Sequence, residues 1–247
     1  VFNKPQMYNL YLICLSLLLL ITPIYLNKNN QPKVRRLKSI NRIGPLNKDV
    51  ISIIFGSLLG EAYGEKRLLG VGTKFYFYQE GSHVKYLMFL HKLLSELGYC
   101  HPNFPVITTR LGSKGKLRKV ASFATWTYSN FNWIYYLWYK NHIKQVPECI
   151  DQYLTSLALA IWFMNNGAII GKHIKVCTNS FSYSDCLLLI KALYNNFNIK
   201  ASIQSAGVGA GKKDRYMISI WKESVNDLNN LISPYIIPEM KYKLNYT

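Results

Sequence analysis

Two apolar stretches of the chain end in polar residues that could take part in chemistry on an anionic partner. Glu61 closes the stretch Val50–Tyr63, and Asn166 closes the stretch Leu154–Ala168. A lysine follows each of them at a similar separation of about 80 residues, Lys144 after Glu61 and Lys243 after Asn166. A carboxylate is an oxygen ligand that Mg²⁺ accepts, and a lysine supplies a compact positive charge. The matched spacing indicates corresponding positions in two related halves.

The cysteines do not form a recognisable site. There are five, scattered widely along the chain, without a Cys-x-x-Cys pair and without a cysteine–histidine cluster at zinc spacing. We therefore expect buried thiols rather than a disulfide framework or a structural zinc.

The composition points to a polyanionic partner. The 247 residues include 30 Lys and Arg against 12 Asp and Glu, a formal net charge of +18. Aromatic residues make up 14% of the chain, so an intrinsically disordered chain is excluded. A large positive charge on a folded chain favours nucleic acid or an anionic membrane surface as the partner.

The elements that must position these residues repeat in the same order. The first set comprises a buried helix over Val50–Tyr63, a strand over Thr73–Glu80, a helix over Val84–Leu97, a basic loop over Arg110–Lys119, a strand over Val120–Tyr128 and an aromatic helix over Asn130–Lys140. The second set comprises a buried helix over Leu154–Ala168, strands over Ile174–Asn179, Ile199–Ser205 and Arg215–Trp221, and helices over Ser184–Asn195 and Val225–Ile232. This order predicts an internal duplication. In the aromatic helix, the spacing favours core packing over the stacking of RNA bases.

The two buried stretches and their flanks resemble the double-motif LAGLIDADG homing endonucleases and maturases encoded in mitochondrial group I introns. The phrases IIFGSLLGEAYGEKR and LALAIWFMNNGA correspond to the two signature helices, and the resemblance extends over residues 40–247. It implies an α+β fold with two pseudo-symmetric αββαββα halves, over residues 40–150 and 151–247, in a monomer with internal pseudo-twofold symmetry. It also implies a mitochondrial origin.

The resemblance assigns catalytic positions to Glu61, Asn166, Lys144 and Lys243. Each signature helix would present one carboxylate at the scissile phosphate, where Mg²⁺ held at Glu61 and Asn166 would assist hydrolysis. The two lysines would polarise solvent or neutralise charge that develops on the phosphate. This chain departs from the pattern because Asn165 and Asn166 stand where family members commonly carry aspartate. An amide keeps an oxygen but loses the charge, so whether this chain is still an enzyme is open, and Mg²⁺ is expected only if it cuts.

Small residues at helical spacing would let the two signature helices approach closely. Gly56 and Gly60 share one face of the first helix, and Ser156 and Ala160 share one face of the second. A glycine inside a helix costs about 0.5–1 kcal/mol, so two at this spacing favour a helix–helix interface.

The resemblance also implies a nucleic-acid face made by the strands and loops of both halves. The residues expected to face nucleic acid from the strands are Lys74, Tyr76, Tyr78, Arg118, Lys175, Gln204 and Arg215. Those expected to reach it from loops are Arg110, Lys114, Lys116, Lys119, Lys172, Lys212 and Lys213. Phosphate contacts from such residues position a protein, and base-edge contacts specify sequence.

Residues 1–39 form an apolar and basic segment apart from both halves. Leu10–Leu26 is continuously apolar, at the short limit for a membrane span, and basic residues follow it. We expect an extra apolar helix here, with three interpretations open: a membrane anchor, a processed segment or a remnant of upstream coding sequence.

The sequence favours a maturase that helps a group I intron RNA to splice. The alternative is a Mg²⁺-dependent DNA homing endonuclease or nickase that cuts a long intronless target. A degenerate relic is a third interpretation. The missing acids at Asn165 and Asn166 motivate the first choice.

Overall fold

Two short helices occupy the centre of the molecule, and each begins at a capping side chain. Helix α2 (Lys48–Leu58) starts where Asn47 accepts a hydrogen bond from the Asp49 amide. Helix α6 (Ser156–Asn166) starts where Thr155 accepts one from the Ala158 amide. Such caps satisfy backbone donors that a helix leaves unpaired at its first turn. The Thr155 hydroxyl also donates to Ser52 Oγ at 2.8 Å, which joins the starts of the two helices.

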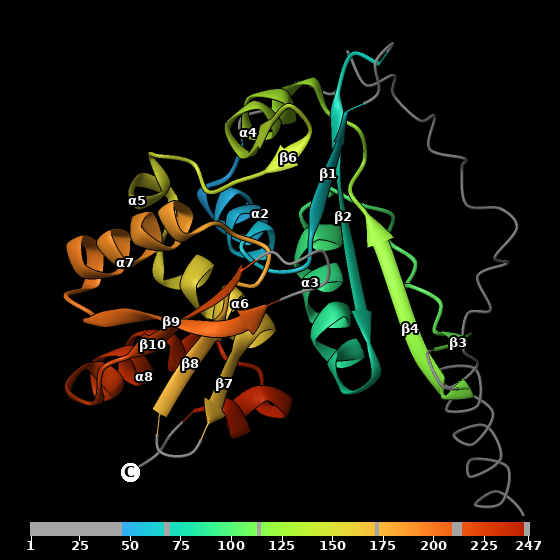
Figure 1. Ribbon diagram of the computed structural model, residues 1–247. Coiled ribbons are helices and arrows are strands. Elements are labelled where there is room, and N and C mark those ends of the chain that lie inside the picture. Colours follow the sequence, from blue (N-terminus) through green and yellow to red (C-terminus); the bar gives the residue numbers. More distant parts are fainter. Residues whose placement is uncertain (1–45, 67–69, 113–114, 171–172, 209–213, 245–247) are drawn as a thin grey trace, which may run out of the picture. The chain divides into compact units, whose positions relative to one another are not determined.

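The computed structural model describes residues 46–66, 70–112, 115–170, 173–208 and 214–244 (Figure 1). Residues 1–39, with the predicted apolar helix, lie outside these ranges, as do Lys114, Lys172, Lys212 and Lys213. Within the described ranges, no helix combines the length and the apolar character needed to cross a membrane.

The first half builds a four-stranded antiparallel sheet after α2. Its further elements are β1 (Tyr63–Lys66), β2 (Thr73–Glu80), α3 (Val84–Glu96), β3 (Thr108–Leu111), β4 (Leu117–Ala124) and α4 (Asn132–Trp138), with 3₁₀ turns η2 (Gly81–His83) and η4 (Ser129–Phe131). The strand order is β1-β2-β4-β3. Helix α3 packs on β2 and β4 and covers one face of the sheet (Figure 1).

The second half repeats this plan after α6. Its further elements are β7 (Gly167–Ile170), β8 (His173–Cys177), α7 (Tyr183–Phe197), β9 (Ala201–Val208), β10 (Asp214–Ile220) and α8 (Val225–Ile232), with 3₁₀ turns η6 (Lys222–Ser224), η7 (Ser233–Tyr235) and η8 (Pro238–Lys243). The order β7-β8-β10-β9 matches that of the first sheet, and α7 packs on β9 and β10. Between the halves lie β5 (Tyr139–Lys140), β6 (Ile143–Lys144) and α5 (Ile150–Tyr153). The predicted α+β fold with two αββαββα halves is confirmed.

Several predicted boundaries are wrong. The helix expected to reach Tyr63 ends at Leu58, and Tyr63–Lys66 pairs with β2 as a strand. Strand β7 likewise follows α6 without a break, so apolar continuity concealed a change of backbone conformation at both places. The expected loop over Arg110–Lys119 is mostly a hairpin, because Arg110 pairs with Arg118 and Thr109 pairs with Lys119.

The aromatic run belongs mainly to the core, as its spacing predicted. Phe131 and Trp138 are fully buried. Phe55 of α2 lies 5.6 Å from Trp138 and 4.5 Å from Tyr153, measured between ring centroids. Tyr136 is the exception in this helix, at 63% exposed.

Helices α2 and α6 pack directly on each other at Gly56, whereas Gly60 lies in the turn after α2 and not on the helix face where it was expected. A Cβ atom placed at Gly56 would lie 3.0 Å from the Cα of Ala158, so the two backbones nearly touch. One placed at Gly60 would lie 2.8 Å from the Asn166 Oδ1. The residue opposite Gly56 is thus Ala158, which the sequence analysis did not single out. Of the two expected α6 residues, Ala160 is fully buried and Ser156 is half-buried at the first position of the helix.

Candidate nucleic-acid cleft

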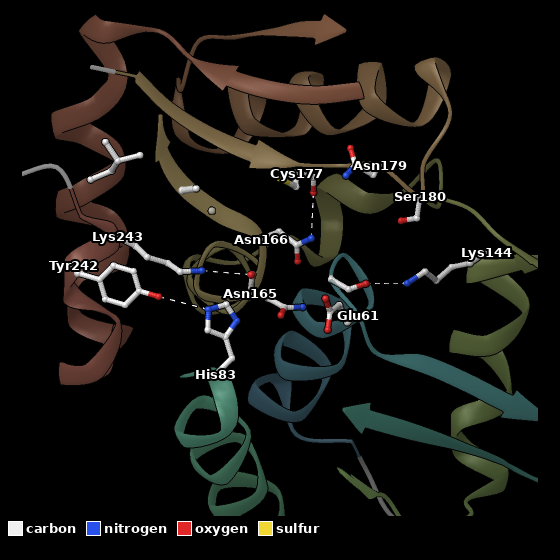
Figure 2. A pocket seen from close by; sticks show the side chains of 14 residues that line it. Glu61, His83, Lys144, Asn165, Asn166, Cys177, Asn179, Ser180, Tyr242 and Lys243 are labelled. Carbon is white, nitrogen blue, oxygen red and sulfur yellow. Dashed lines mark hydrogen bonds between the residues drawn. The ribbon is translucent and has the colours of Figure 1, made fainter. Parts of the chain in front are cut away.

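The C-terminal ends of α2 and α6 converge on one cleft of about 810 Å³ (Figure 2). Glu61 reaches it from the turn after α2, and Asn165 and Asn166 reach it from the last turn of α6. Lys144 and Lys243 line the same cleft. The four positions expected to correspond therefore meet in one place, although they are far apart in the sequence. We call this space the central cleft.

Glu61 is an exposed carboxylate at the side of the central cleft. Its pKa is raised, mainly because the surrounding protein removes part of its solvent, and secondarily because Glu80 lies nearby. Lys144 and Lys243 act in the opposite direction and lower the pKa of Glu61, but by less. Glu61 is the sole acidic residue among the described residues that line this cleft.

The two asparagines make different contacts. Gln79 of β2 donates a hydrogen bond of 2.6 Å to Asn165 Oδ1, which ties the first sheet to the end of α6. Asn166 donates from Nδ2 to the carbonyl of Cys177 at 3.2 Å. Its Oδ1 is buried and has no hydrogen-bond partner within the described part of the chain. A buried acceptor without a partner costs free energy, so a hydrogen-bond donor or a cation could bind to this oxygen.

Lys144 is bound to the end of α2. Its ammonium donates to the carbonyl oxygens of Leu58 and Gly60 at 3.0 Å and of Ala62 at 3.1 Å. Leu58 is the last residue of α2, and Gly60 and Ala62 follow in the turn after it. The negative end of a helix dipole favours a cation at this place. Burial lowers the pKa of Lys144 to about 8, against a smaller effect of Glu61.

Lys243 holds the end of α6 in the same manner. It is 6% exposed and donates to the Met164 carbonyl at 2.6 Å and to the Asn165 carbonyl at 3.4 Å. Burial lowers the pKa of Lys243 to about 8, while Cys177 and Glu61 oppose this change. The two lysines thus share one structural role, and the three protons of Lys144 are all directed at carbonyl oxygens. Their expected role toward a phosphate stays a prediction.

The donor set of the central cleft is poor in charge for a metal centre. Glu61 and the unpaired Asn166 Oδ1 are ligands of the kind that Mg²⁺ takes, completed by phosphate oxygens of a bound nucleic acid. A centre for two metal ions needs more acidic ligands than one glutamate, and two ammonium groups flank this one. These residues therefore fit one weakly bound cation and do not fit a two-metal centre. Within the described ranges, no three His, Cys, Asp or Glu side chains gather where they could hold a metal ion.

Two further residues line the cleft without any signal in the sequence. His83, in η2, lies at its edge, and the Tyr242 hydroxyl is 3.5 Å from His83 Nε2 (Figure 2). Burial lowers the pKa of His83, and Lys243 lowers it further. Glu80, at the end of β2, shares a smaller depression with Glu61, a proximity that the sequence analysis did not anticipate. Glu80 is paired with Arg118 at 3.0 Å.

The open face of each sheet carries part of the predicted basic set. In the first sheet, Lys74, Tyr76 and Tyr78 alternate outward along β2, and Tyr78 donates a 2.6 Å hydrogen bond to Glu80. Arg110 and Arg118 stand opposite each other, whereas Lys119 alternates to the other face. Lys116 is exposed in the loop between β3 and β4.

In the second sheet, Lys175 and Gln204 share a face through their register with β10. Arg215 alternates onto the same face beside a β-bulge. In the first sheet, Arg110 belongs to β3 and Lys119 to β4, so both lie in strands rather than in the loops where the sequence analysis expected them.

Comparison with known proteins identifies this arrangement of paired sheets and converging helices. The sequence model of the LAGLIDADG DNA endonuclease family matches residues 51–228. The chain belongs to this family, as its two signature stretches predicted.

Two relatives are named as maturases. A protein of Saccharomyces cerevisiae named cytochrome b mRNA maturase bI2 is 48% identical over 233 residues, which cover 90% of this chain and 54% of that protein. The chain thus spans about half the length of this relative. The protein of the same name from Debaryomyces hansenii is 45% identical and is covered to 80%, for 86% of this chain.

A solved structure shares the fold. The homing endonuclease I-WcaI, bound to its DNA recognition sequence, matches with a TM-score of 0.71 and 25% sequence identity. The match covers 83% of this chain and 89% of that one.

Proposed function

We propose that this chain is an intron-encoded maturase that binds a structured group I intron RNA and assists its splicing without cutting nucleic acid. The observation that carries this proposal is the central cleft, where Asn166 occupies the position that corresponds to Glu61 and leaves a single carboxylate. The similarity to two proteins named maturases supports the same function.

Binding would rest on the basic open faces of the two sheets. Lys and Arg side chains on these faces neutralise phosphates, and this term dominates affinity for nucleic acid. The 30 Lys and Arg residues outnumber the 12 Asp and Glu residues, which leaves a net charge of +18 for contacts with phosphates. The chain would bind the sugar-phosphate backbone of the RNA. A protein that binds only the folded intron shifts the folding equilibrium of the intron RNA toward the folded form by mass action.

A second candidate is a Mg²⁺-dependent DNA endonuclease or nickase. Glu61 retains its carboxylate in the central cleft, and the fold matches a homing endonuclease solved with DNA. In that case Glu61 and Asn166 would hold the cation together with a phosphate, and the cation would stabilise charge on the phosphate.

The setting of the protein follows from the same relatives. We infer a mitochondrial, intron-encoded origin, since the relatives include cytochrome b mRNA maturases. We also propose that the chain acts as a monomer, in which residues 40–150 and 151–247 are the two pseudo-symmetric halves. A membrane contact would fall to residues 1–39.

The test compares RNA splicing with DNA cleavage in one preparation. Precursor RNA that contains the intron next to this reading frame is incubated with the protein, and splicing and filter binding are measured. Exon-junction DNA is incubated in parallel with Mg²⁺. Faster splicing without DNA cleavage supports the maturase. Cleavage or nicking without an effect on splicing supports the second candidate, and absence of RNA binding above background excludes the maturase.

A further inference from the structure

An exposed tyrosine ring and a half-buried one stack on each other on the first sheet. Tyr63 of β1 and Tyr76 of β2 are directly paired in register. Their ring centroids are 4.9 Å apart with an interplanar angle of 13°, and Tyr63 is 48% exposed. Along β2 the alternate residues Phe75 and Phe77 are buried, so Tyr76 points to the opposite, open face. A flat aromatic surface is therefore presented on the same face as the predicted basic residues.

A lysine accompanies the ring pair. The ammonium of Lys74 lies 4.4 Å from the centroid of the Tyr76 ring. Lys74 stands two residues before Tyr76, and Arg110 and Arg118 lie on the same sheet. Two stacked rings with a cation match the chemistry of a nucleotide, which offers a planar base and a phosphate.

The second half lacks this feature at the corresponding place. Tyr63 follows Glu61 by two residues, and Ala168 follows Asn166 in the same way. Ala168 pairs with Lys175, so neither residue of the corresponding pair carries a ring. The fold thus builds the equivalent strand pair without tyrosines. Cross-strand aromatic pairs can stabilise a sheet, but the second half forms the equivalent strand pair without one.

We propose that Tyr63 and Tyr76, with Lys74, form a stacking platform for an unpaired nucleotide base. This inference rests on the proposed function and narrows it to nucleic acid with unstacked bases. In a duplex, the base faces are covered by neighbouring bases, whereas in loops and bulges they are free to stack on aromatic side chains. Lys74 would contact the phosphate or the ring edge of the same nucleotide. Tyr63 was outside the predicted nucleic-acid set because its strand was not recognised.

The test uses three variants and three probes. Tyr63→Leu keeps apolar bulk and removes the ring, and Tyr63→Phe keeps the ring. Tyr194→Leu is the matched control, because Tyr194 is 54% exposed on α7, which packs on β9 and β10 of the other sheet. The probes are a hairpin RNA with a fluorescent purine analogue in its loop, a blunt RNA duplex, and single-stranded DNA with the loop sequence. Binding is followed by anisotropy and by quenching of the analogue, and the thermal unfolding midpoint of each variant is recorded.

We expect Tyr63→Leu to weaken binding of the hairpin RNA about 10-fold and to abolish quenching, as the loss of one stacked base would. Binding of the blunt duplex should stay unchanged, and Tyr63→Phe and Tyr194→Leu should match the wild type. If single-stranded DNA responds like the hairpin, the platform takes bases on either backbone. If it does not, the platform selects RNA. Equal quenching by the wild type and Tyr63→Leu would overturn the platform while leaving RNA binding intact. If the wild type binds no RNA, the maturase proposal itself fails. A lowered midpoint of Tyr63→Leu with an equal loss on all probes would assign Tyr63 a structural role and also overturn the platform.

Discussion

The ammonium nitrogen of Lys144 lies 3.0 Å from the carbonyl oxygen of Gly60, the residue that precedes Glu61. Lys243 holds the end of the other central helix in the same way, through the carbonyls of Met164 and Asn165. Each lysine therefore donates to carbonyl oxygens at the C-terminal end of a central helix, next to the residue that lines the central cleft. Because these contacts fix the backbone on either side of Glu61, they position the carboxylate whether or not the chain cuts nucleic acid.

Removing the Lys144 ammonium should destabilise the fold. Lys144→Met leaves three carbonyl oxygens at the end of α2 and in the turn after it without their donor, and a buried acceptor left without a partner costs about 1–3 kcal/mol. We expect a loss of about 2 kcal/mol in the free energy of unfolding, measured by urea denaturation. Lys140→Met, at an exposed neighbour in β5, is the control and should change it by less than about 0.5 kcal/mol. Equal stability of the two variants would show that the carbonyl contacts contribute nothing.

Affinity for RNA should fall as the pH rises from about 7 to about 9, because Lys144 and Lys243 have a pKa of about 8. Each loses a positive charge in the central cleft over this window, whereas ordinary lysines stay charged up to about pH 10. Filter binding across this pH range should show the decline in affinity. In Lys243→Met, which lacks one of the two titrating groups, the decline should be smaller. A flat profile for the wild type would contradict the lowered pKa values.

Stability should change in the opposite direction with pH. The folded chain releases these two protons near pH 8, and the unfolded chain keeps them up to about pH 10.5. Since the unfolded state binds more protons between these values, the free energy of unfolding gains a contribution there as the pH rises. In urea titrations at several pH values, the free energy of unfolding of Lys144→Met should rise less steeply with pH than that of the wild type. An equal rise in both proteins would contradict the lowered pKa of Lys144.

Gly56 should tolerate no side chain. In Gly56→Ala the new Cβ would meet the backbone of Ala158, which cannot rotate away, so we expect a loss of about 1–3 kcal/mol. The intrinsic helix preference of alanine over glycine, about 1 kcal/mol, acts in the other direction. Gly60→Ala is the comparison, since its Cβ would meet the side-chain amide of Asn165, which can move. We expect a lower thermal unfolding midpoint for Gly56→Ala than for Gly60→Ala. The opposite ranking would refute this helix–helix interface.

A carboxylate at position 166 should strengthen cation binding. Asn166→Asp places a second acid beside Glu61 and supplies a charged ligand where the unpaired Oδ1 now lies. We expect tighter Mg²⁺ binding by calorimetry, at some cost in stability, because the donor to the Cys177 carbonyl is lost. Asn165→Asp is the control, since its oxygen already accepts from Gln79. If both variants bind Mg²⁺ alike, position 166 has no special relation to Glu61.

The sequence allowed the duplicated architecture and the composition of the cleft to be predicted. Glu61, Asn166, Lys144 and Lys243 were expected to correspond, and all four line one cleft because the halves repeat the same element order. The glycine at position 56 was informative for a related reason, because two helix backbones can approach closely only where the side chains between them are very small.

The remaining contacts could not be predicted from local patterns. Gln79 and Asn165 meet across 86 residues, and neither belongs to a motif. The binding of Lys144 to the end of α2 depends on the path of β5 and β6, which the aromatic pattern at Tyr139 concealed within a helix. Strand β1 escaped notice because it is four residues long and follows a turn that continues the apolar stretch.

The most direct test of the central claim is the splicing rate of the precursor RNA with the Glu61→Gln variant. If the chain assists splicing through its basic faces and not through cleavage, Glu61→Gln should accelerate splicing as much as the wild type does, and neither should cut the exon-junction DNA in Mg²⁺. Wild-type cleavage of that DNA, abolished by Glu61→Gln and accompanied by no effect on splicing, would contradict the account.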